Sequence, residues 1–285
     1  MKALVATGDD DLVEFRDVDP PAAGPGEVLV DVRAVSLNRG ELHRLRSAAA
    51  GWRPGWDFAG TVAADSAFPA GTPVCGLATG GSWAERVCVP DDRLTCVPPA
   101  VPLSRAAALP VAGLTALRTL RLAGELTGRR VHVTGSSGGV GGYAVDLARR
   151  AGARVVAAAD EGCDVVLESV GGGSLAAALA AVAPGGLVVS FGNSAREQAT
   201  FDPSAFYPRQ AMLRGYYLLD DVIADPPAAD LAHLVHLVAN GELRNDVTHV
   251  ADWLHARTAL TDMRERRLHG KAVLEVTRCH SARSR

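Results

Sequence analysis

The pattern of hydrophobic and polar residues changes about one third of the way along the chain. Before that point, short apolar or alternating runs are separated by acidic residues or by Pro and Gly, and such runs are typical of β-strands. The strands predicted in this way cover Lys2–Thr7, Leu12–Asp17, Glu27–Val35, Phe58–Ala63, Pro73–Leu77 and Trp83–Val89. Many short strands joined by turns indicate a small barrel or sandwich.

After Pro102, segments with apolar residues at helical spacing alternate with short β-branched runs. The predicted helices cover Ser104–Leu109, Gly113–Ala123, Gly138–Ala151, Ser174–Val182, Asp230–Asn240 and Ala256–Arg266. The predicted strands cover Val131–Gly135, Arg154–Ala159, Asp164–Ser169, Leu187–Phe191 and Lys271–Val276. Strands that alternate with helices form a parallel sheet with helices on both faces, so this part is predicted to be α/β.

Composition and charge narrow the classes of partner. The 285 residues include 29 Lys+Arg against 32 Asp+Glu, so no basic surplus is available to neutralise a nucleic acid backbone. The length predicts about two domains.

The uncharged stretch Ser169–Ala195 is broken by Gly171–Gly173 and Pro184–Gly186, which predicts a buried helix and strand, not a membrane span. The acidic start MKALVATGDDD does not resemble a signal peptide. We therefore expect a cytoplasmic protein with neither nucleic acid nor membrane as a partner.

The strongest chemical signal follows the predicted strand Val131–Gly135. Gly135, Gly138 and Gly141 recur at three-residue spacing where this strand leads into a helix. Glycines at such a junction allow a tight turn, and the helix amino terminus attracts a pyrophosphate with its backbone N–H groups. The turn therefore predicts a dinucleotide site; the alternative is an ordinary strand–helix turn that binds nothing.

Several segments together resemble the medium-chain dehydrogenase/reductase superfamily and, within it, the zinc-independent quinone oxidoreductases. They are PPAAGPGEVLVDVRAVSLNRGEL, PGWDFAGTV, AALPVAGLTALRTL, VTGSSGGVGGYAVDLARRAGARVV, CDVVLESVGG, PGGLVVSFGN and HGKAVLEV. The resemblance implies an α/β protein with a GroES-like β-barrel catalytic domain and a Rossmann domain, a doubly wound parallel sheet. The expected bounds are 1–103 and 243–285 for the catalytic domain and 104–242 for the Rossmann domain, with the active site in the cleft.

The resemblance also implies NADPH or NADH as cofactor and assigns residues to it. These are Thr115, Gly135, Ser136, Ser137, Gly138, Gly139, Val140, Gly141, Ser169, Val170, Gly192, Asn193 and Lys271. For Lys271, pairing with a nearby acid is the alternative.

No metal is expected. In zinc-dependent relatives, a Cys-x-x-Asp and a Gly-His-Glu segment supply the ligands; here the corresponding segments begin with Asn38 and contain Trp56. An amide and an indole replace the thiolate and imidazole that zinc favours.

Hydride transfer to an activated acceptor, a quinone or an enone, needs no Lewis acid. By resemblance, Asn38 lines the cleft and could donate a hydrogen bond there. Arg39 and Trp56 are candidates for substrate contact, with surface and packing roles as their alternatives.

One departure from the family lies after the second predicted Rossmann strand. Relatives continue through a helix and a strand, whereas here Ala157–Cys163 leads directly into the next strand, so roughly 30 residues, or one βα unit, are missing. Three outcomes stay open. Asp160 or Glu161 binds a free ribose 2′-OH and favours NADH; Arg149, Arg150 or Arg154 binds a 2′-phosphate; or nucleotide affinity has been lost.

Three functions follow from these observations. The leading hypothesis is an NAD(P)H-dependent reductase of a quinone or enone. The second is a non-redox biosynthetic enzyme, such as a cyclase or isomerase, on the same scaffold, and the third is a non-catalytic partner subunit. The resemblance further implies a homodimer, formed by edge pairing of Rossmann sheets near GGLVVSFG.

Overall fold

The computed structural model describes residues 1–158 and 162–277, and the chain folds into two units. The first unit comprises Met1–Val111, Pro226–Asn240 and, as far as it is described, Val247–Arg285. The second comprises Ala112–Asp225 and Gly241–Asp246. We describe each unit by itself.

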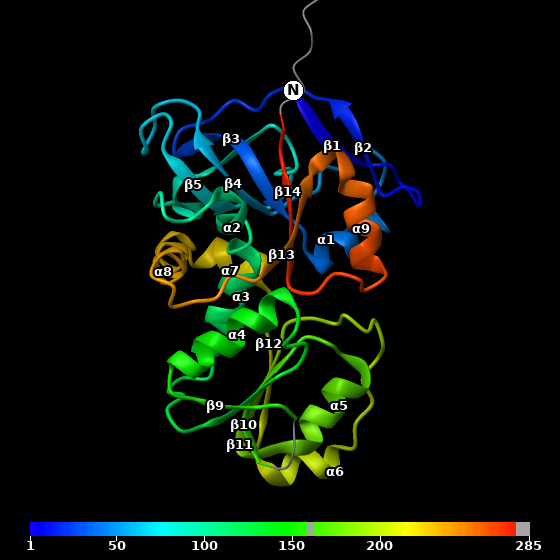
Figure 1. The fold of residues 1–285 in the computed structure, drawn as a ribbon. Coiled ribbons are helices and arrows are strands. Elements are labelled where there is room, and N and C mark those ends of the chain that lie inside the picture. The colour runs from blue at the N-terminus through cyan, green and yellow to red at the C-terminus, as the bar shows by residue number, and fades with distance from the viewer. Residues whose placement is uncertain (159–161, 278–285) are drawn as a thin grey trace, which may run out of the picture. The chain divides into compact units, whose positions relative to one another are not determined.

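The first unit is built on a mainly antiparallel sheet of seven strands. Along the sheet the order is β13 (Val247–Asp252), β14 (Lys271–Glu275), β3 (Glu27–Ser36), β4 (Asp57–Val62), β5 (Pro73–Leu77) and β7 (Leu94–Cys96), while β6 (Arg86–Pro90) pairs with β3. A separate two-stranded sheet joins β1 (Lys2–Ala6) to β2 (Val13–Asp17). Strand β14 thus lies between β3 and β13 (Figure 1). The β-rich architecture predicted for the first hundred residues is confirmed.

Alternation along β3 explains how this sheet builds its core. Val28, Val30 and Val32 are buried, whereas Glu27, Leu29 and Asp31 between them are only partly buried. Side chains of a strand point alternately to its two faces, so one face of β3 turns its valines towards the interior. Phe58, Trp83 and Trp253 are the bulkiest aromatic side chains of that core, each fully buried.

Among the described residues, four α-helices lie within the first unit. They are α1 (Arg39–Leu45), α2 (Leu103–Ala106), α8 (Ala228–Ala239) and α9 (Ala256–Arg264). The expected domain bounds at 103 and 242 stay a prediction; by contacts, the first unit continues to Val111 and also includes α8. The physical reason is packing: α2 lies against β3, β4 and β5, and α8 lies against β7 and buries Leu231 and Leu234 completely.

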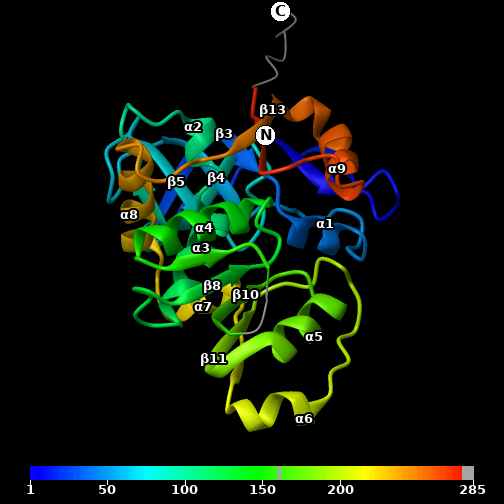
Figure 2. The ribbon, with the colours of Figure 1, turned by 60° about the horizontal axis from the view of Figure 1, so that its bottom comes forward.

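The second unit holds a parallel sheet with helices on both faces, as predicted. The strand order is β12 (Met212–Gly215), β11 (Val182–Ser190), β10 (Cys163–Glu168), β8 (Arg130–Val133) and β9 (Arg154–Val156). The accompanying helices are α3 (Pro110–Arg121), which begins in the first unit, α4 (Gly139–Arg150), α5 (Gly172–Ala181), α6 (Pro203–Phe206) and α7 (Leu218–Ala224). Helices α4 and α5 lie on opposite sides of β10 (Figure 2).

The sheet of the second unit ends at β9. Only residues 157–162 separate β9 from β10, although a connection between parallel strands usually takes a dozen or more residues. Within the described residues no strand pairs with the outer side of β9. The Rossmann sheet is therefore shortened by about one βα unit, as the sequence predicts.

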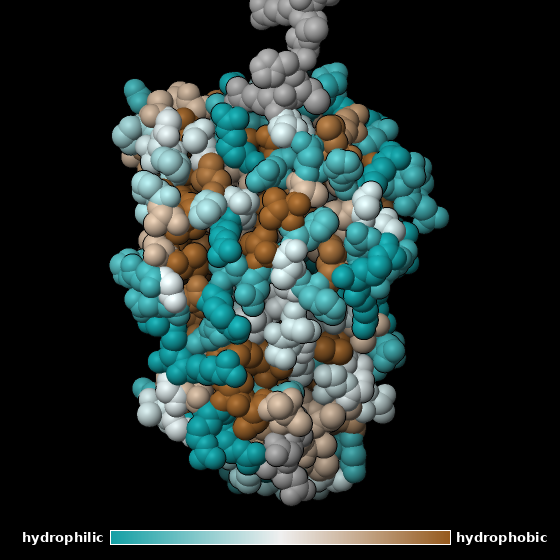
Figure 3. Space-filling view, viewed as in Figure 1, coloured by the Kyte–Doolittle hydropathy of each residue, from teal (hydrophilic) through white to brown (hydrophobic). Residues whose placement is uncertain are grey.

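On the face seen in Figure 3, hydrophobic residues come in small groups among hydrophilic ones. None of the helices in residues 1–158 and 162–277 combines the length and the apolar character that crossing a membrane requires.

Candidate active site

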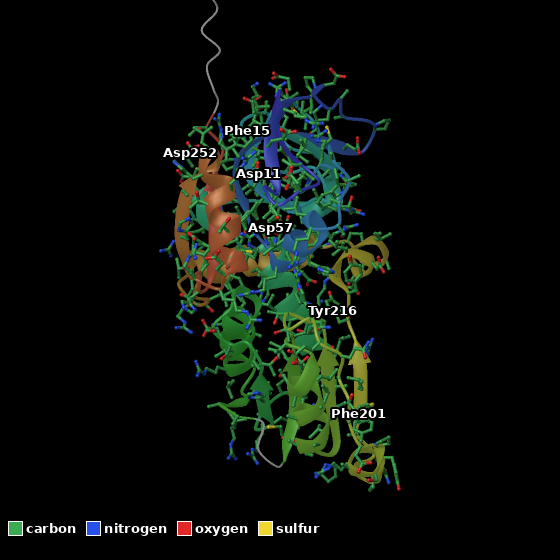
Figure 4. The ribbon with its side chains drawn as sticks, turned by 90° about the vertical axis from the view of Figure 1, so that its right-hand side faces the viewer. Asp11, Phe15, Asp57, Phe201, Tyr216 and Asp252 are labelled. Atoms are coloured by element: carbon green, nitrogen blue, oxygen red, sulfur yellow. The ribbon has the colours of Figure 1, made fainter. Side chains whose placement is uncertain are left out.

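A buried polar cluster joins four side chains of the first unit, each from the beginning of an element. Asn38 precedes the first residue of α1, Glu41 lies in the first turn of α1, Asp57 begins β4 and Lys271 begins β14. Glu41 and Asp57 are fully buried, and Lys271 is 5% exposed. Asp57 is seen within the first unit in Figure 4. Charged groups at this depth require partners.

The ammonium group of Lys271 has an acceptor for each of its three N–H donors. Nζ lies 2.7 Å from Oδ1 of Asn38, 3.3 Å from Oδ2 of Asp57 and 3.2 Å from the carbonyl oxygen of Leu37. An ammonium group has three donors and no acceptor. The three donors of Lys271 are thus engaged by the protein itself, and its role in binding the cofactor stays a prediction. The alternative, pairing with a nearby acid, is what the structure contains.

The amide of Asn38 is held in one orientation by this cluster. Its Oδ1 accepts from Lys271, and its Nδ2 donates to Oδ2 of Asp57 at 2.9 Å and to Oε2 of Glu41 at 3.2 Å. A flipped amide would turn its NH₂ group towards an ammonium, so the assignment is physically determined. Both amide hydrogens are directed at carboxylates. The role of Asn38 as a donor to a substrate oxygen stays a prediction.

Glu41 connects α1 to the segment that precedes β4. Its Oε2 accepts the backbone N–H of Asn38 at 2.8 Å, as in a capping box, and its Oε1 accepts the backbone N–H of Trp56 at 2.7 Å. Burial, with a smaller contribution from the charge of Asp57, raises the pKa of Glu41 to about 8, above the ordinary 4.5. Glu41 therefore keeps its proton to a higher pH than an ordinary glutamate does.

Asp57 also fixes the backbone around it. Its Oδ1 accepts the N–H of Val111 at 2.7 Å, and its carbonyl oxygen accepts the hydroxyl of Ser82 at 3.0 Å. The start of β4 is thereby tied to the start of α3. Sequence reasoning missed Glu41 and Asp57 as members of the site; the available signal was two acids in the segments aligned with the metal ligands of relatives.

Trp56 and Arg39 differ in their surroundings. Trp56 is 6% exposed, and its six-membered ring lies so close to Gly40 that a Cβ there would be 2.7 Å from Cη2. Within the described residues, Nε1 of Trp56 is buried and has no hydrogen-bond partner. Arg39 is exposed at the start of α1, and its pKa lies below the usual arginine value because of desolvation and the nearby charge of Arg266. Trp56 therefore offers a buried donor, whereas Arg39 lies at the surface.

The donor set of the cluster does not fit zinc. No thiolate or imidazole belongs to it, and the ammonium of Lys271 already lies between the oxygens of Asn38 and Asp57, where a cation would bind. Among residues 1–158 and 162–277, His, Cys, Asp and Glu side chains form no group of three that could hold a metal ion.

In the second unit, the glycine-rich turn runs from the end of β8 into α4. Gly135 has φ of +62°, a conformation that side chains rarely adopt, and its carbonyl oxygen accepts the N–H of Gly138 at 2.9 Å. A Cβ at Gly141 would lie 2.3 Å from that same oxygen, so Gly141 permits the close packing of helix on turn. A Cβ at Gly138 would meet only this oxygen, at 3.2 Å. The residues Gly135, Ser136 and Ser137 are exposed, and Gly138, Gly139 and Val140 are partly exposed.

The space beside Gly138, at the amino terminus of α4, is thus open apart from the carbonyl oxygen of Gly135. Backbone N–H groups in a first helical turn have no partners within the helix and favour an anion. The turn therefore fits the diphosphate of a nicotinamide dinucleotide.

Four other predicted cofactor residues gather at the same edge of the sheet. A Cβ at Gly135 would lie 3.1 Å from Oγ of Ser169 and 4.0 Å from Cγ2 of Val170, both just after β10. Gly192 follows β11, and a Cβ on it would be 3.0 Å from the carbonyl oxygen of Ser169. Asn193 lies against Gly171 and donates to the carbonyl of Glu197 at 3.2 Å. These residues line the carboxyl ends of neighbouring parallel strands, where α/β sheets bind ligands.

Glu168, which the sequence analysis missed, organises this edge. It is fully buried at the end of β10, and it accepts from the backbone of Val170 at 2.9 Å, the backbone of Gly171 at 3.1 Å and the hydroxyl of Ser174 at 2.9 Å. The sequence feature that could have identified Glu168 is an acidic residue at the end of an apolar strand. Through these bonds Glu168 fixes the loop that carries Ser169 and Val170.

Two further predicted residues are Thr115 and Asp160. Thr115 lies within α3, where it is 6% exposed and its carbonyl accepts the hydroxyl of Thr119 at 2.6 Å. Asp160 lies outside the described residues. Their cofactor roles stay predictions.

Comparison with known proteins agrees with both units. Family models match residues 24–99, described as an alcohol dehydrogenase GroES-like domain, and residues 144–274, described as a zinc-binding dehydrogenase. A quinone oxidoreductase of Pseudomonas aeruginosa is 29% identical over 327 aligned residues, covering 95% of this chain and 98% of that protein. The spectinabilin polyketide synthase system protein NorB of Streptomyces orinoci is 33% identical over 90% of this chain, which spans 13% of that protein.

Solved structures show the same fold. The quinone oxidoreductase from Coxiella burnetii superposes with a TM-score of 0.84 at 22% identity, covering 97% of this chain and 99% of that one. The CurK enoyl reductase superposes with a TM-score of 0.85 at 22% identity, with coverage of 97% and 99%.

These matches and the two units define an oxidoreductase with a GroES-like domain and a nicotinamide-nucleotide-binding Rossmann domain. The chain belongs to the medium-chain dehydrogenase/reductase superfamily and is quinone oxidoreductase-like.

Proposed function

We propose that this chain is an NAD(P)H-dependent oxidoreductase that reduces a quinone or an α,β-unsaturated carbonyl compound without zinc. The observation that carries the proposal is the open space beside Gly138, in the glycine-rich turn at the amino terminus of α4. A diphosphate bound there would accept hydrogen bonds from backbone N–H groups and interact favourably with the helix dipole. The relatives named quinone oxidoreductase and enoyl reductase support the choice of acceptor.

The residues that would hold the nucleotide are those of the glycine-rich turn, with Ser169, Val170, Gly192 and Asn193 at the same sheet edge. A reduced nicotinamide, when bound, supplies a hydride for an electrophilic carbon or a quinone. Glu168 keeps the loop after β10 in place while the nucleotide enters and leaves.

In the first unit, Trp56 is the proposed donor to the substrate oxygen. A buried N–H without an acceptor costs about 1–3 kcal/mol, which a carbonyl or quinone oxygen would recover. That hydrogen bond strengthens as the oxygen gains negative charge during reduction. Asn38, Glu41, Asp57 and Lys271 are positioning residues, since their hydrogen bonds hold the segment that carries Trp56.

Zinc independence is supported by the same cluster. The ammonium of Lys271 takes the place of a cation between Asn38 and Asp57, and the ligands around it are oxygens only. We therefore propose that removal of metal ions leaves the activity unchanged.

The proposal is tested with the purified chain, NADH or NADPH, and two acceptors, 1,4-naphthoquinone and 2-cyclohexenone. We expect saturable binding in a fluorescence titration and consumption of reduced nicotinamide with at least one acceptor, before and after treatment with EDTA. Binding of neither nucleotide by a folded chain would contradict the proposal and favour the non-redox alternative, a cyclase or isomerase. Loss of activity with EDTA, restored by zinc, would contradict metal independence alone.

We also propose that a second copy of the chain pairs with β12. The sequence analysis placed this contact near GGLVVSFG, but that segment forms β11, whose two sides are occupied by β10 and β12. The outer strand is β12, and its Met212 and Leu213 are 56% and 45% exposed. Such an edge favours pairing with another strand.

A further inference from the structure

The segment that comprises α1 and its connection to β4 carries a surplus of positive charge. Residues 38–56 contain four arginines and one acid, which are Arg39, Arg44, Arg46 and Arg53, and Glu41. Glu41 is fully buried, whereas the arginines are exposed or, for Arg53, partly exposed. The chain as a whole has more acidic than basic residues, 32 against 29. The charge of residues 38–56, which we call the arginine segment, is therefore a local surplus.

Ion pairs do not neutralise this surplus. In the part of the chain that the structure describes, no acid forms a salt bridge with an arginine of the segment. Other arginines of the first unit do have such partners: Arg16, Arg86 and Arg257 lie 2.6 Å, 2.8 Å and 3.0 Å from carboxylate oxygens. Arg44 lies over the ring of Trp52, with 5.5 Å between Cζ and the ring centroid, and this cation–π contact keeps the positive charge. The segment therefore presents guanidinium groups that can bind an anion.

The arginine segment folds so that its last residues lie along α1. Trp52 contacts Arg44 near the carboxyl end of α1. At the start of α1, the ring of Trp56 lies so close to Gly40 that a Cβ there would be 2.7 Å from it. Arg39 is bonded to Gly40, and consecutive Cα atoms are about 3.8 Å apart. Arg39 is therefore beside the indole whose N–H is the proposed donor to the substrate oxygen.

Arg53 and Arg39 are suited to an anion for different reasons. Nε of Arg53 is buried and has no hydrogen-bond partner among the described residues, although buried donors in folded proteins are usually satisfied. Arg39 lies near a second cation: desolvation, and then the charge of Arg266, lowers the pKa of Arg39, and α1 packs against α9, which Arg266 follows. An anion would supply the acceptor that Nε lacks and would offset the repulsion between two guanidinium groups.

We infer that the acceptor reduced by this chain carries an anionic group, such as a carboxylate, sulfonate or phosphate, which the arginine segment binds through Arg39 and Arg53. This inference rests on the proposed function and names its substrate class, a quinone or enone with an anionic substituent. The acceptor takes up a hydride from the reduced nicotinamide and a proton from solvent, two electrons in all, and its anionic substituent is unchanged.

The anionic substituent has two effects on the acceptor. Guanidinium groups bind such anions through paired N–H donors, so the substituent orients the acceptor while Trp56 donates to the oxygen that is reduced. The positive surplus also attracts an anionic acceptor from a distance, and added salt weakens this attraction. Anionic acceptors are therefore bound and oriented better than neutral ones of the same shape.

The test compares 1,4-naphthoquinone with 1,4-naphthoquinone-2-sulfonate, with NADH or NADPH as reductant. The measured quantity is the ratio of kcat/KM for the sulfonate to kcat/KM for the neutral quinone, and comparison between variants cancels the difference in reactivity of the two quinones. We expect Arg39→Gln to lower this ratio by about tenfold, and the double variant Arg39→Gln, Arg53→Gln to lower it further. A second pair, 2-cyclohexenone and 3-oxo-1-cyclohexenecarboxylate, applies the same test to enones.

Arg257→Gln is the matched control. It removes one positive charge from the same unit, but Asp11 already neutralises that charge at 3.0 Å. The ratio should therefore change by less than about twofold. Salt gives an independent readout: between about 0.01 M and about 1 M NaCl the Debye length falls from about 30 Å to about 3 Å, so the ratio should fall for the wild-type chain and stay nearly constant for the double variant.

Dissociation constants for NADH and NADPH distinguish the acceptor from the nucleotide as the source of the anion. They should be the same in the double variant and the wild-type chain. Weaker nucleotide binding with an unchanged ratio would assign the arginines to the phosphates of the nucleotide and would overturn the inference. If the wild-type chain reduces the neutral acceptors but the double variant keeps the wild-type ratio, only this inference fails. If the wild-type chain reduces no acceptor with either nucleotide, the proposed function fails and this inference fails with it.

Discussion

Lys271 and Asp57 form a buried ion pair, with 3.3 Å between Nζ and Oδ2, although 214 residues separate them in the sequence. The side chain of Lys271 is 5% exposed and that of Asp57 is fully buried. Removing one partner of such a pair leaves an uncompensated charge in the interior, which costs far more than loss of a surface pair. The stability of the first unit therefore depends on both partners of this pair, and substitution of one partner alone should lower the free energy of unfolding.

We expect Lys271→Met to lower the free energy of unfolding by about 3–5 kcal/mol. The double variant Lys271→Met, Asp57→Asn should lose clearly less than the sum of the two single variants, because no isolated charge remains. Urea unfolding measures these differences. The only other lysine of the chain provides a matched control: Lys2 pairs with Asp17 at 2.8 Å at the surface, so Lys2→Met should cost at most about 1 kcal/mol. Equal costs for the two lysines would show that the buried pair is unimportant.

The raised pKa of Glu41 predicts a particular dependence of stability on pH. With a pKa of about 8 in the folded chain and an ordinary 4.5 in the unfolded chain, the folded chain binds more protons between these values. The free energy of unfolding therefore falls as pH rises through this window, by about 1 kcal/mol per pH unit for this one group.

Glu41→Gln removes this proton while keeping the shape of the side chain. We expect the wild-type chain to lose stability relative to Glu41→Gln between pH 5 and pH 8 in urea titrations, and the difference to become constant above about pH 9. A difference that does not change with pH would mean that Glu41 is ionised throughout.

The unpartnered indole of Trp56 predicts an effect on turnover. Trp56→Phe keeps most of the ring and removes the N–H, so we expect kcat/KM for the quinone or enone to fall by about 10–100-fold while nucleotide affinity stays the same. Trp83 is the control, because its Nε1 is also buried without a partner in the described chain and its side chain is fully buried in the core. Trp83→Phe should leave kcat/KM unchanged. Equal effects of both variants would assign Trp56 to packing.

The glycine-rich turn predicts opposite effects at two adjacent positions. In Gly141→Ala the new Cβ would lie 2.3 Å from the carbonyl oxygen of Gly135, so the turn must shift, and we expect at least a tenfold loss of NADH affinity and a stability cost of about 1–3 kcal/mol. In Gly142→Ala the Cβ would meet nothing within 4 Å, and alanine favours a helix by up to about 1 kcal/mol. Calorimetric titration compares the two variants. Unchanged NADH affinity in Gly141→Ala would separate the turn from nucleotide binding.

The exposed outer strand predicts the effect of added charge on assembly. A lysine in place of Leu213 would oppose pairing of β12 with another strand, so Leu213→Lys should shift a dimer towards the monomer in light scattering. Leu254→Lys is the control, because Leu254 is similarly exposed, at 55%, but belongs to the short helix after β13. A wild-type chain that is monomeric at all accessible concentrations would contradict the proposed pairing.

Local patterns predicted most of the fold, and the elements they missed are short and carry weak local signals. The predicted strand Pro73–Leu77 matches β5, and the bounds of α4 differ by one residue at each end. Helix α1 was missed because its seven residues, RGELHRL, are few and contain a glycine. Strand β12 was missed because all four of its residues are exposed and carry no apolar alternation.

The candidate site was predictable only where its residues lie close together in the sequence. Glycine spacing located the nucleotide turn because the motif is contiguous. The donors around Asn38 were not predictable, because Lys271 reaches them only through the pairing of β14 with β3. The role expected of Lys271 followed family position, whereas its three acceptors depend on that pairing.

The position of β14 inside the first sheet also sets the order in which the chain can mature on the ribosome. Asn38 and Asp57 are synthesised long before Lys271, and the whole of Ala112–Asp225 is translated in between. At about 5–20 residues per second, roughly 10–30 s pass between completion of the amino-terminal segment and arrival of β14. During that interval β3 lacks its neighbour β14, and the acids Glu41 and Asp57 lack the ammonium of Lys271, while the segment Ala112–Asp225 of the second unit is free to fold. A chain released before Lys271 would therefore contain the glycine-rich turn but lack β14 and its pairing with β3 in the first unit. Chaperones or proteases would act on this incomplete chain first.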